Sequence, residues 1–421
     1  MMAATVQISN VNENPSSRRI FIIGAGIVGA SLAYFLSREQ PNRKVIVIDK
    51  CWDELLGSTG HAPGFVGQLN ESSVLTNLAK DTVSEYLKVP GGFNVVGGLE
   101  LSSTDSGVET LYRRRDLALA AGLHAEILSP GDAASLAPDF IDAASVKNGL
   151  HFSSDGTANA QTITSYYIQQ AQLKGAKLVE ATVTGFDLKN GEITVIQSLA
   201  GDIKTHGSTV VLATGIWTSS LASDVPSPVP IVPVAHPYTF TPPRPYRSGA
   251  PYPFIRWLDH HAYARDHGDR DGMGSYDHPP LRLDAGQTAI GPWSSEFETV
   301  LSKASSHLKN GKEFLMNGSG NDRNKYKPFN GIFSVTPDNL PFAGKVSGVS
   351  NLWLCAAIWV TTAAGTAKFI TREILRDGDH ATPEDEELRK ALSPFRFQGM
   401  ETYTLESQAL ARYNDIYNRE V

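Results

Sequence analysis

The chain has 421 residues, a formal net charge of −7 and 41% hydrophobic residues. One hydrophobic core rarely serves this length, so two lobes are expected, and the acidic balance argues against nucleic acid as the main partner. No apolar run approaches the ~20 residues that span a bilayer, which argues against a membrane-embedded protein.

Cysteine usage and the start of the chain bear on the compartment. Only Cys51 and Cys355 are present, with no metal-ligand spacing and no disulfide framework. Residues 1–19 are mostly polar, contain Glu13 and make a poor signal or transit peptide. These observations favour a cytoplasmic location.

The first predicted elements are a strand, a glycine turn and a helix, in RRIFIIGAGIVGASLAYFLSRE. Residues 20–23 are a continuous apolar run, which is typical of a buried parallel strand. Gly24, Gly26 and Gly29 then form G-x-G-x-x-G, in which the first glycine makes the turn, the second lets the backbone approach a pyrophosphate and the third lets helix and strand pack closely. The helix carries one apolar stripe, made of Val28, Leu32, Phe35 and Leu36.

A second apolar strand, KVIVID, ends at Asp49. That acid lies about 20 residues past the glycines, where a ribose-binding carboxylate belongs. Because strand, glycines, helix, second strand and acid agree, the sequence predicts a dinucleotide-binding turn and not merely a structural one. The motif alone does not separate FAD from NAD.

Two later segments are expected to complete the nucleotide-binding domain. Residues 177–215 indicate a strand, a meander and a last apolar strand that ends in Ala213-Thr214-Gly215. Near residue 361 a helix is predicted to open, between Thr361 and Gly365, and its N-terminus could face a flavin carbonyl. An ordinary β-α unit that closes the sheet would give the same pattern.

Six stretches together resemble one family. They are GSTGHAPG, VGGLEL, PVAHPYTF, HHAYARDHGDRDGMGSY, NGIFSVTPD and AIWVTTAAG. Their combination is similar to the dimethylglycine oxidase, dimethylglycine dehydrogenase and sarcosine dehydrogenase branch of the D-amino acid oxidase superfamily. The resemblance implies FAD as the cofactor, with contacts at Asp49, Lys50, Val183, Gly215, Thr336, Trp359, Val360 and Thr361 besides the glycine turn.

The same resemblance implies that His61, in GSTGHAPGFVGQ, carries the flavin covalently. The chemistry needs a neutral imidazole held against the dimethylbenzene edge of the ring system, and burial among small residues favours the neutral form. Asn330-Gly331-Ile332 stands where the cysteine tether of monomeric sarcosine oxidase would be, so histidine is the expected tether. A core histidine bonded to backbone is the alternative.

The resemblance places His236 and Tyr263 in the catalytic site. His236 would orient the substrate amine and keep it unprotonated, because a protonated amine has no lone pair to support hydride loss. A strand histidine that points into the sheet is the alternative. Tyr263 would bond the substrate carboxylate or a water, and Arg256 and Arg265 are carboxylate-binding candidates because guanidinium offers a bidentate fork.

Four further patterns have structural interpretations. His260, His261 and His267 do not have the carboxylate spacing of a metal site, and HGDR is expected to be a turn stabilised by Asp269 and Arg270. The charge run RRRDLALAAG at 113–122 is expected to be a solvated helix surface. The acidic PEDEE near 383 is expected to start a last helical region.

We therefore predict an α/β (α+β, two-lobed) flavoprotein with a Rossmann-type FAD-binding domain and an antiparallel-sheet substrate domain. The expected boundaries are 1–89, 146–225 and 329–380 for the FAD-binding domain, 90–145 and 226–328 for the substrate domain, and 381–421 for a C-terminal helical extension.

The predicted function is FAD-dependent oxidative N-demethylation of a small secondary or tertiary amino acid of the dimethylglycine or sarcosine type. Hydride would pass from the N-methyl carbon to flavin N5, and O2 would then give hydrogen peroxide. The branch usually continues into a folate-binding domain and this sequence stops before one, so free formaldehyde is the expected product. Three alternatives stay open: oxidation of a bulkier amine, a dehydrogenase with another electron acceptor, and a non-enzymatic flavin-binding scaffold.

Overall fold

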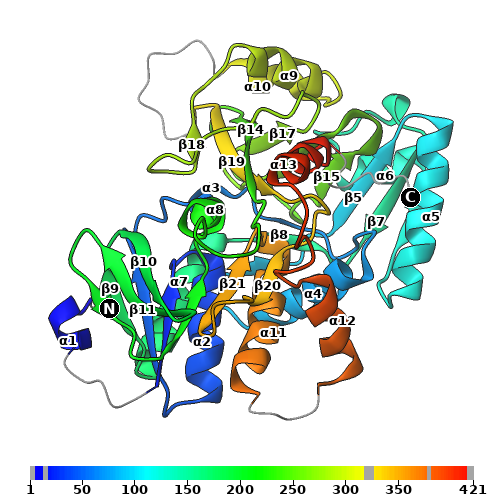
Figure 1. The fold of residues 1–421 in the computed structure, drawn as a ribbon. Coiled ribbons are helices and arrows are strands. Elements are labelled where there is room, and N and C mark those ends of the chain that lie inside the picture. Colours follow the sequence, from blue (N-terminus) through cyan, green and yellow to red (C-terminus); the bar gives the residue numbers. More distant parts are fainter. Residues whose placement is uncertain (1–4, 13–17, 317–326, 377–380, 415–421) are drawn as a thin grey trace.

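The computed structural model describes residues 5–12, 18–316, 327–376 and 381–414. Figure 1 shows two lobes: the lower one holds a sheet covered by helices, and the upper one holds a larger sheet. Among the described residues, no helix is long and apolar enough to cross a bilayer. The predicted fold class is confirmed.

The lower lobe is built on a six-stranded sheet that is parallel except at one edge. In spatial order its strands are β20 (Phe342–Lys345), β21 (Leu352–Ala356), β13 (Thr209–Leu212), β1 (Arg19–Ile23), β2 (Lys44–Asp49) and β9 (Lys177–Glu180). β1 is buried along its whole length, as the continuous apolar run predicts. Its alternate side chains serve two cores, since Ile22 packs with the helices on one face and Phe21 packs on the other.

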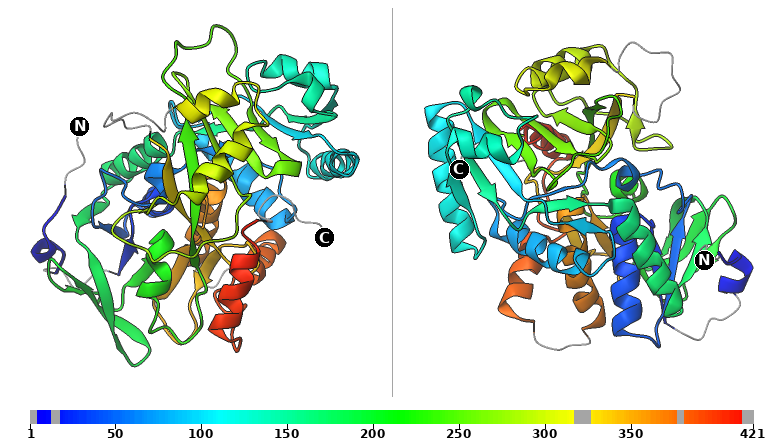
Figure 2. Two further views of the ribbon diagram at one scale, coloured as in Figure 1. Left: turned by 90° about the horizontal axis from the view of Figure 1, so that it is seen from above. Right: turned by 180° about the vertical axis from the view of Figure 1, so that it is seen from behind.

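Four helices form a row on one face of this sheet, and the right-hand view of Figure 2 shows that side. They are α4 (Ser73–Tyr86), α11 (Ala363–Leu375), α2 (Ile27–Glu39) and α7 (Ala160–Leu173). A three-stranded antiparallel meander covers the other face through Ile193, Ile196 and Ile203. It consists of β10 (Val183–Lys189), β11 (Glu192–Ser198) and β12 (Ile203–Lys204), beside the short α1 (Ile8–Asn12). The predicted meander between the first and last apolar strands of this segment is therefore present.

The upper lobe is built on a nine-stranded sheet that is antiparallel except where β15 meets β5. Its strands in order are β18 (Ile290–Gly291), β19 (Phe329–Val335), β14 (Val232–Phe240), β17 (Asp271–Ser275), β16 (Ala262–Asp266), β15 (Phe254–Trp257), β5 (Gly98–Ser102), β7 (Asn148–Phe152) and β6 (Glu126–Leu128). Helices α5 (Asp105–Ala120), α6 (Pro130–Leu136), α9 (Glu296–Ser305) and α10 (Gly311–Leu315) belong to the same lobe. A small sheet of β3 (Phe65–Val66), β8 (Gly156–Ala158) and β4 (Phe93–Asn94) lies beneath.

The pairing of two strands differs from the sequence-derived boundaries. β7 and β19 pair within the nine-stranded sheet, whereas boundaries at 146 and 329 had put both in the FAD-binding domain. The physical reason is that an apolar strand pattern reports burial and not the identity of the neighbouring strand. The sheet of the upper lobe therefore extends beyond the predicted boundaries of the substrate domain.

The charge run on α5 is a second difference. Arg114 is only 2% exposed, and it donates from Nε to Glu100 and from Nη1 to Glu71, each over 2.7 Å. The expectation of a wholly solvated surface is wrong at this residue, because one face of α5 lies on β5 and β7. Arg115 on the same helix is much more exposed and follows the expectation.

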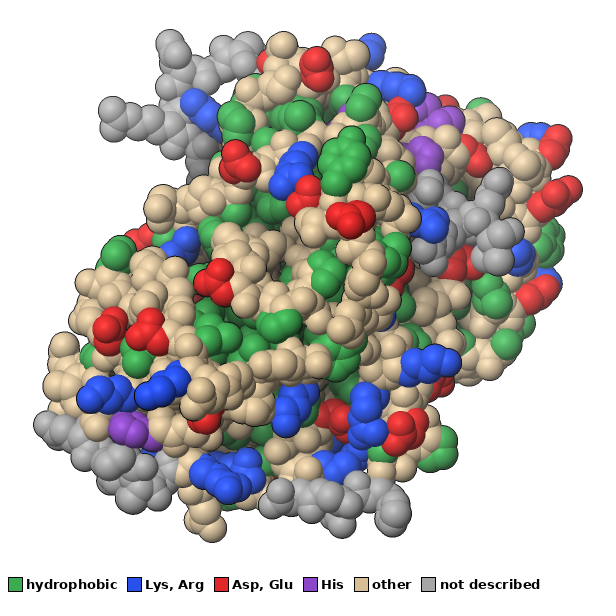
Figure 3. All heavy atoms as spheres, in the orientation of Figure 1, with side chains coloured by type: hydrophobic (Ala, Val, Ile, Leu, Met, Phe, Trp, Pro, Cys, Tyr) green, Lys and Arg blue, Asp and Glu red, His purple; other side chains and the backbone are tan. Residues whose placement is uncertain are grey.

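The C-terminal region contains two helices. α12 (Pro383–Ala391) begins at the predicted PEDEE segment, where the Thr382 hydroxyl caps the Asp385 amide. α13 (Thr402–Ala411) instead lies against β14 of the upper lobe. The residues that follow α13 thereby reach the upper sheet, where Tyr413 packs with Tyr238, Tyr263 and Tyr276. Figure 3 shows hydrophobic side chains gathered near the middle of this face of the molecule.

Candidate functional site

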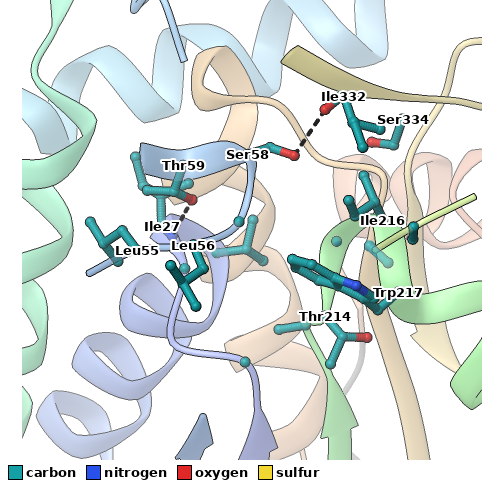
Figure 4. Close-up of a pocket in the computed structure, with 18 of the residues that line it drawn as sticks. Ile27, Leu55, Leu56, Ser58, Thr59, Thr214, Ile216, Trp217, Ile332 and Ser334 are labelled. Atoms are coloured by element: carbon teal, nitrogen blue, oxygen red, sulfur yellow. Dashed lines mark hydrogen bonds between the residues drawn. The ribbon is translucent and has the colours of Figure 1, made fainter. Parts of the chain in front are cut away.

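A cavity of about 670 Å³ runs between the two lobes. Its floor is made by the carboxyl ends of β1, β2 and β13, and its far wall by β14 and β19. Figure 4 shows this cavity with α3 (Ser58–His61), which crosses it and is fixed by the Ser58 hydroxyl donating to the Ile332 carbonyl. Ligand sites in α/β sheets occur at the carboxyl ends of strands, so the position fits a nucleotide site.

The glycine turn forms the floor of the cavity. Gly24 has a φ of +103°, and a Cβ there would lie 2.4 Å from the Ala213 oxygen. A Cβ at Gly29 would lie 1.8 Å from the Gly24 oxygen, so helix α2 and strand β1 pack as closely as the motif predicts. Gly26 lines the cavity at the N-terminus of α2. The Thr59 hydroxyl accepts from the Ile27 amide over 3.0 Å, a contact that spans 32 positions and that sequence reasoning missed.

Asp49 lies at the end of β2 and lines the cavity. One carboxylate oxygen accepts from the Ala25 amide over 2.7 Å and the other from the Cys51 amide over 2.8 Å. The acid is therefore anchored to the glycine turn, at the place where the sequence pattern expects a ribose-binding carboxylate.

A segment of the upper lobe, residues 285–287, closes one side of the cavity. The Trp217 indole donates to the Gly286 carbonyl over 2.7 Å, and the Lys50 ammonium donates to the Gln287 carbonyl over 2.5 Å. The same ammonium lies 3.8 Å from the centre of the Trp217 ring. Lys50 thus lines the cavity, as do Val183 and Gly215, and it also holds the two lobes together.

The predicted cofactor contacts between residues 336 and 361 differ in position. Trp359 and Val360 line the large cavity, and Thr361 lines a neighbouring one. A 3-10 turn over Val360–Thr362 leads into α11, so the predicted helix start is confirmed. Thr336 lies outside both cavities, since its hydroxyl donates to the Leu340 carbonyl within a turn after β19.

His61, the last residue of α3, lines the large cavity. Burial lowers the pKa of its imidazole, which favours the neutral form. Its ring makes no hydrogen bond with any residue in the described ranges, and the Phe329 ring centre lies 6.2 Å away. The alternative of a core histidine bonded to backbone is therefore not what the structure shows.

A second cavity of about 120 Å³ adjoins the first. The two share lining residues, namely Ala62, Pro63, His236, Phe333, Trp359 and Val360. The second cavity is rich in aromatic rings, contributed by Phe65, Trp257, Tyr263, Tyr276, Phe333 and Trp359. The predicted catalytic pair, His236 and Tyr263, is brought together there from β14 and β16.

His236 is 6% exposed and makes a hydrogen bond at each ring nitrogen. Its Nε2 lies 2.5 Å from the Tyr263 hydroxyl, and its Nδ1 lies 2.7 Å from the Tyr413 hydroxyl. Burial is the main cause that lowers the pKa of His236 to about 3, so the imidazole is neutral at physiological pH. The alternative of a side chain that merely points into the sheet is excluded by its position in both cavities.

Tyr413 is a site residue that sequence reasoning missed. It is fully buried just past α13, and its hydroxyl also lies 2.9 Å from Nε2 of His278. Nothing in ALARYND marks this tyrosine, because its place depends on α13 packing against β14.

The two predicted carboxylate-binding arginines differ in position. Arg256 lines the second cavity, but its Nη1 donates to Glu100 over 3.3 Å. Close by, burial raises the pKa of Asp155 to about 7, and the Arg256 charge opposes that rise. Arg265 shares a strand face with Tyr263, yet it lies outside both cavities and donates to the Pro63 and Asp266 carbonyls.

The three histidines weighed as metal ligands lie in separate surroundings. His260 stacks on His307 at 3.6 Å, His261 lines the second cavity, and the Nε2 of His267 lies 2.9 Å from the Tyr238 hydroxyl. The His267 amide donates to the Arg270 carbonyl, so HGDR is a turn, and Asp269 pairs with Arg270. Within the ranges that the structure describes, no group of three or more metal-ligating side chains is found.

The large cavity fits FAD by its own features. Its volume lies in the usual range of cofactor sites, and its floor approaches any occupant as bare backbone at Gly24 and Gly26. Asp49 lines the floor, where the sequence pattern expects the ribose, and His61 and the second cavity also border this space. These residues leave room for a nucleotide at one end and a flat ring at the other.

Comparison with known proteins identifies the family. The family model described as DAO, FAD dependent oxidoreductase, matches residues 19–373. The chain is 26% identical over 418 residues to mitochondrial dimethylglycine dehydrogenase of Mus musculus, covering 95% of this chain and 46% of that protein. It is also 26% identical over 355 residues to 4-methylaminobutanoate oxidase (formaldehyde-forming) of Paenarthrobacter nicotinovorans, covering 81% of this chain and 41% of that protein. The chain thus spans less than half the length of these two relatives.

A solved structure shares the fold. The L-proline dehydrogenase from P. horikoshii superposes with a TM-score of 0.76 at 22% identity, over 91% of this chain and 99% of that one. With the glycine turn, the cavity and the family match in agreement, this chain belongs to the DAO family of FAD-dependent oxidoreductases.

Proposed function

We propose that the protein oxidatively demethylates a small N-methyl amino acid of the dimethylglycine or sarcosine type, with O2 as electron acceptor and with formaldehyde and hydrogen peroxide as products. The observation that carries the proposal is the joined pair of cavities. His236 and Tyr263 face the second cavity, called the chamber from here on, which shares lining residues with the large cavity, called the cofactor cavity. Relatives named for dimethylglycine and for 4-methylaminobutanoate support an N-methyl amine as the substrate.

The second cavity suits a small methylated amine. Aromatic faces attract alkylammonium groups, and a volume of about 120 Å³ admits only a small group. When bound, the flavin would supply the two-electron chemistry by taking hydride from the methyl carbon.

The protein residues would orient the amine and control its proton. Because the His236 imidazole is neutral, its unprotonated ring nitrogen gives the Tyr263–His236 pair an acceptor for an N–H proton of the substrate. Removal of that proton exposes the lone pair that supports hydride loss. The side chains of His236 and Tyr263 are themselves buried, which strengthens the polar contact between them.

Arg256 is the better of the two candidate partners for a substrate carboxylate, because it alone lines the chamber. Its contact with Glu100 lowers the net charge that it offers. The site therefore favours substrates whose recognition depends mainly on the methylated amine and less on the carboxylate.

We also propose that His61 is the covalent attachment point of the flavin. Its neutral, unbonded imidazole at the cavity wall supports this role. Acid-denatured wild-type protein should keep its flavin by intact mass and absorbance, and His61→Ala should release it. Release of flavin from the wild type would contradict covalent attachment.

The activity is tested by mixing the FAD-loaded protein with dimethylglycine, sarcosine and 4-methylaminobutanoate without oxygen. Bleaching of the flavin absorbance is expected, together with one formaldehyde for each flavin reduced. Admission of air should then give peroxide, and its absence would indicate another electron acceptor. If none of these amines bleaches the flavin, the proposed substrate class is wrong.

A further inference from the structure

Four polar side chains from separate elements form one buried chain of hydrogen bonds beside the chamber. Tyr263 contacts His236 over 2.5 Å, His236 contacts Tyr413 over 2.7 Å, and Tyr413 contacts His278 over 2.9 Å. The chain ends where Nδ1 of His278 lies 2.9 Å from the Pro279 carbonyl. Tyr263, His236, Tyr413 and His278 are 6%, 6%, 0% and 7% exposed.

The carbonyl at the end fixes the direction of every bond. A carbonyl only accepts, so Nδ1 of His278 must carry the proton, and the Nε2 of a neutral His278 must accept from Tyr413. The Tyr413 proton is then used, so its oxygen accepts from Nδ1 of His236. Nε2 of His236 is therefore an acceptor, and the Tyr263 hydroxyl donates to it.

Burial maintains the protonation states that this argument needs. It lowers the pKa of both imidazoles, that of His236 to about 3, so each ring carries one proton. It also raises the pKa of the Tyr413 hydroxyl, which keeps its proton. Each ring therefore has one donor nitrogen and one acceptor nitrogen.

Resting on the proposed function, we propose that Tyr413 and His278 are positioning residues that hold His236 as an acceptor at Nε2. The chain of hydrogen bonds then takes a proton from the substrate ammonium and does not give one. With its own proton directed at His236, the Tyr263 oxygen meets the substrate nitrogen as an acceptor. In the reverse direction Tyr263 would donate to the amine and occupy the lone pair that the reaction needs.

The proton transfer follows the existing bonds. The substrate N–H bond breaks as an O–H bond forms at Tyr263, whose former proton passes to Nε2 of His236. The proton on Nδ1 of His236 passes to Tyr413, and that of Tyr413 passes to Nε2 of His278. The net change is one N–H bond lost by the substrate and one gained by His278. Burial is the first cause that lowers the pKa of His278 and opposes the added proton, and the Pro279 carbonyl and the Asp277 charge offset part of that effect. No electrons are exchanged.

The direction can be measured on the FAD-loaded protein labelled with ¹⁵N-histidine. Long-range ¹⁵N–¹H spectra report which ring nitrogen is protonated, and loss of one set of signals in His236→Gln assigns His236. The wild type should carry the His236 proton on Nδ1. In His278→Leu the Tyr413 hydroxyl keeps only His236 as a hydrogen-bond partner among the described residues, so the proton should move to Nε2 of His236. Tyr413→Phe should give a mixture of both forms.

Tyr167→Phe is the matched control, because the Tyr167 hydroxyl is also buried but has no hydrogen-bond partner among the described residues. It should leave the His236 signals unchanged. A merely structural role for Tyr413 and His278 would not move the proton between nitrogens. An Nε2 proton in the wild type, or identical signals in all variants, would overturn the proposal.

The limiting rate of flavin reduction by sarcosine gives a second readout. It should fall about 10-fold or more in His278→Leu and Tyr413→Phe, since a positioned proton acceptor contributes on this scale, and it should be unchanged in Tyr167→Phe. Equal rates in all four proteins would count against the positioning role. If sarcosine and dimethylglycine fail to reduce even the wild type while the proton moves as expected, the proposed function is wrong and the direction of the chain still holds.

Discussion

At Gly29 the absence of a side chain lets helix α2 pack closely against the glycine turn. A Cβ at this position would lie 1.8 Å from the Gly24 oxygen, which is backbone and cannot rotate away. We expect Gly29→Ala to lower the free energy of unfolding by about 1–3 kcal/mol, as overpacking does, and to lower the FAD content of the purified protein. Denaturant unfolding and flavin absorbance measure both effects.

Gly131→Ala is the control for this change. The nearest atom to its added Cβ is 3.9 Å away, so the free energy of unfolding should change by no more than about 0.5 kcal/mol. Equal stability of the two variants would show that α2 can shift away from β1.

His267 makes stability depend on pH. Burial is the first cause that lowers its pKa well below the unfolded-state value of 6.5, so the folded protein keeps the ring neutral while the unfolded chain takes up a proton. The stabilisation is therefore complete above pH 6.5 and is lost as the pH falls toward the folded-state pKa. We expect His267→Gln to reduce the acid slope of the unfolding free energy by up to about 1.4 kcal/mol per pH unit.

Urea unfolding of both proteins between pH 7 and pH 5 measures this slope. Other buried histidines, including His236 and His278, contribute to the slope of both proteins, so the difference isolates His267. Parallel curves for the two proteins would contradict the assignment.

At the scale of elements, helix α5 is anchored by a charge inside the protein. Arg114 is buried between Glu100 and Glu71, whose side chains are only 4% and 11% exposed. Arg114→Met would leave two carboxylates without this partner, so we expect a loss of about 3–5 kcal/mol in unfolding free energy. Thermal unfolding monitored by circular dichroism measures it.

Arg115→Met on the same helix removes a half-buried cation that pairs with its neighbour Asp116. Its expected cost is about 0–1 kcal/mol. A similar loss in both variants would mean that the helix surface, and not the buried pair, determines stability.

At the scale of the whole molecule, the cofactor cavity is lined by both lobes. FAD bound there contacts the glycine turn and the large sheet together, so it should couple their unfolding. For His61→Ala, we expect protein stripped of FAD to have a lower melting temperature than protein reloaded with FAD. The difference in unfolding free energy should be about 2.7 kcal/mol at a ligand concentration 100 times Kd. Calorimetry measures this, and unchanged midpoints would show that FAD does not bind the folded His61→Ala protein.

The sequence was most informative where the structure depends on neighbours in the chain. The glycine turn, β1, β2 and the start of α11 follow from local patterns. The role of His61, which lines the cavity, was expected from the resemblance alone. His236 and Tyr263 were found through resemblance and lie together.

What the sequence could not predict depends on contacts between distant segments. β7 and β19 join the large sheet because of partners far along the chain, and Arg114 is buried because α5 lies on that sheet. Tyr413 reaches His236 across 177 positions of sequence. No local pattern encodes such pairings, since many registers satisfy the same apolar periodicity.

Residues 285–287 have a consequence for how the protein acquires its cofactor. They are tied to the lower lobe through Trp217 and Lys50, and the Ala289 amide adds a bond of 2.8 Å to the Leu56 carbonyl. Entry of FAD on this side of the cavity would break these three bonds and move the segment aside. Loading kinetics should therefore reach a plateau as FAD concentration rises, at the rate with which the segment opens.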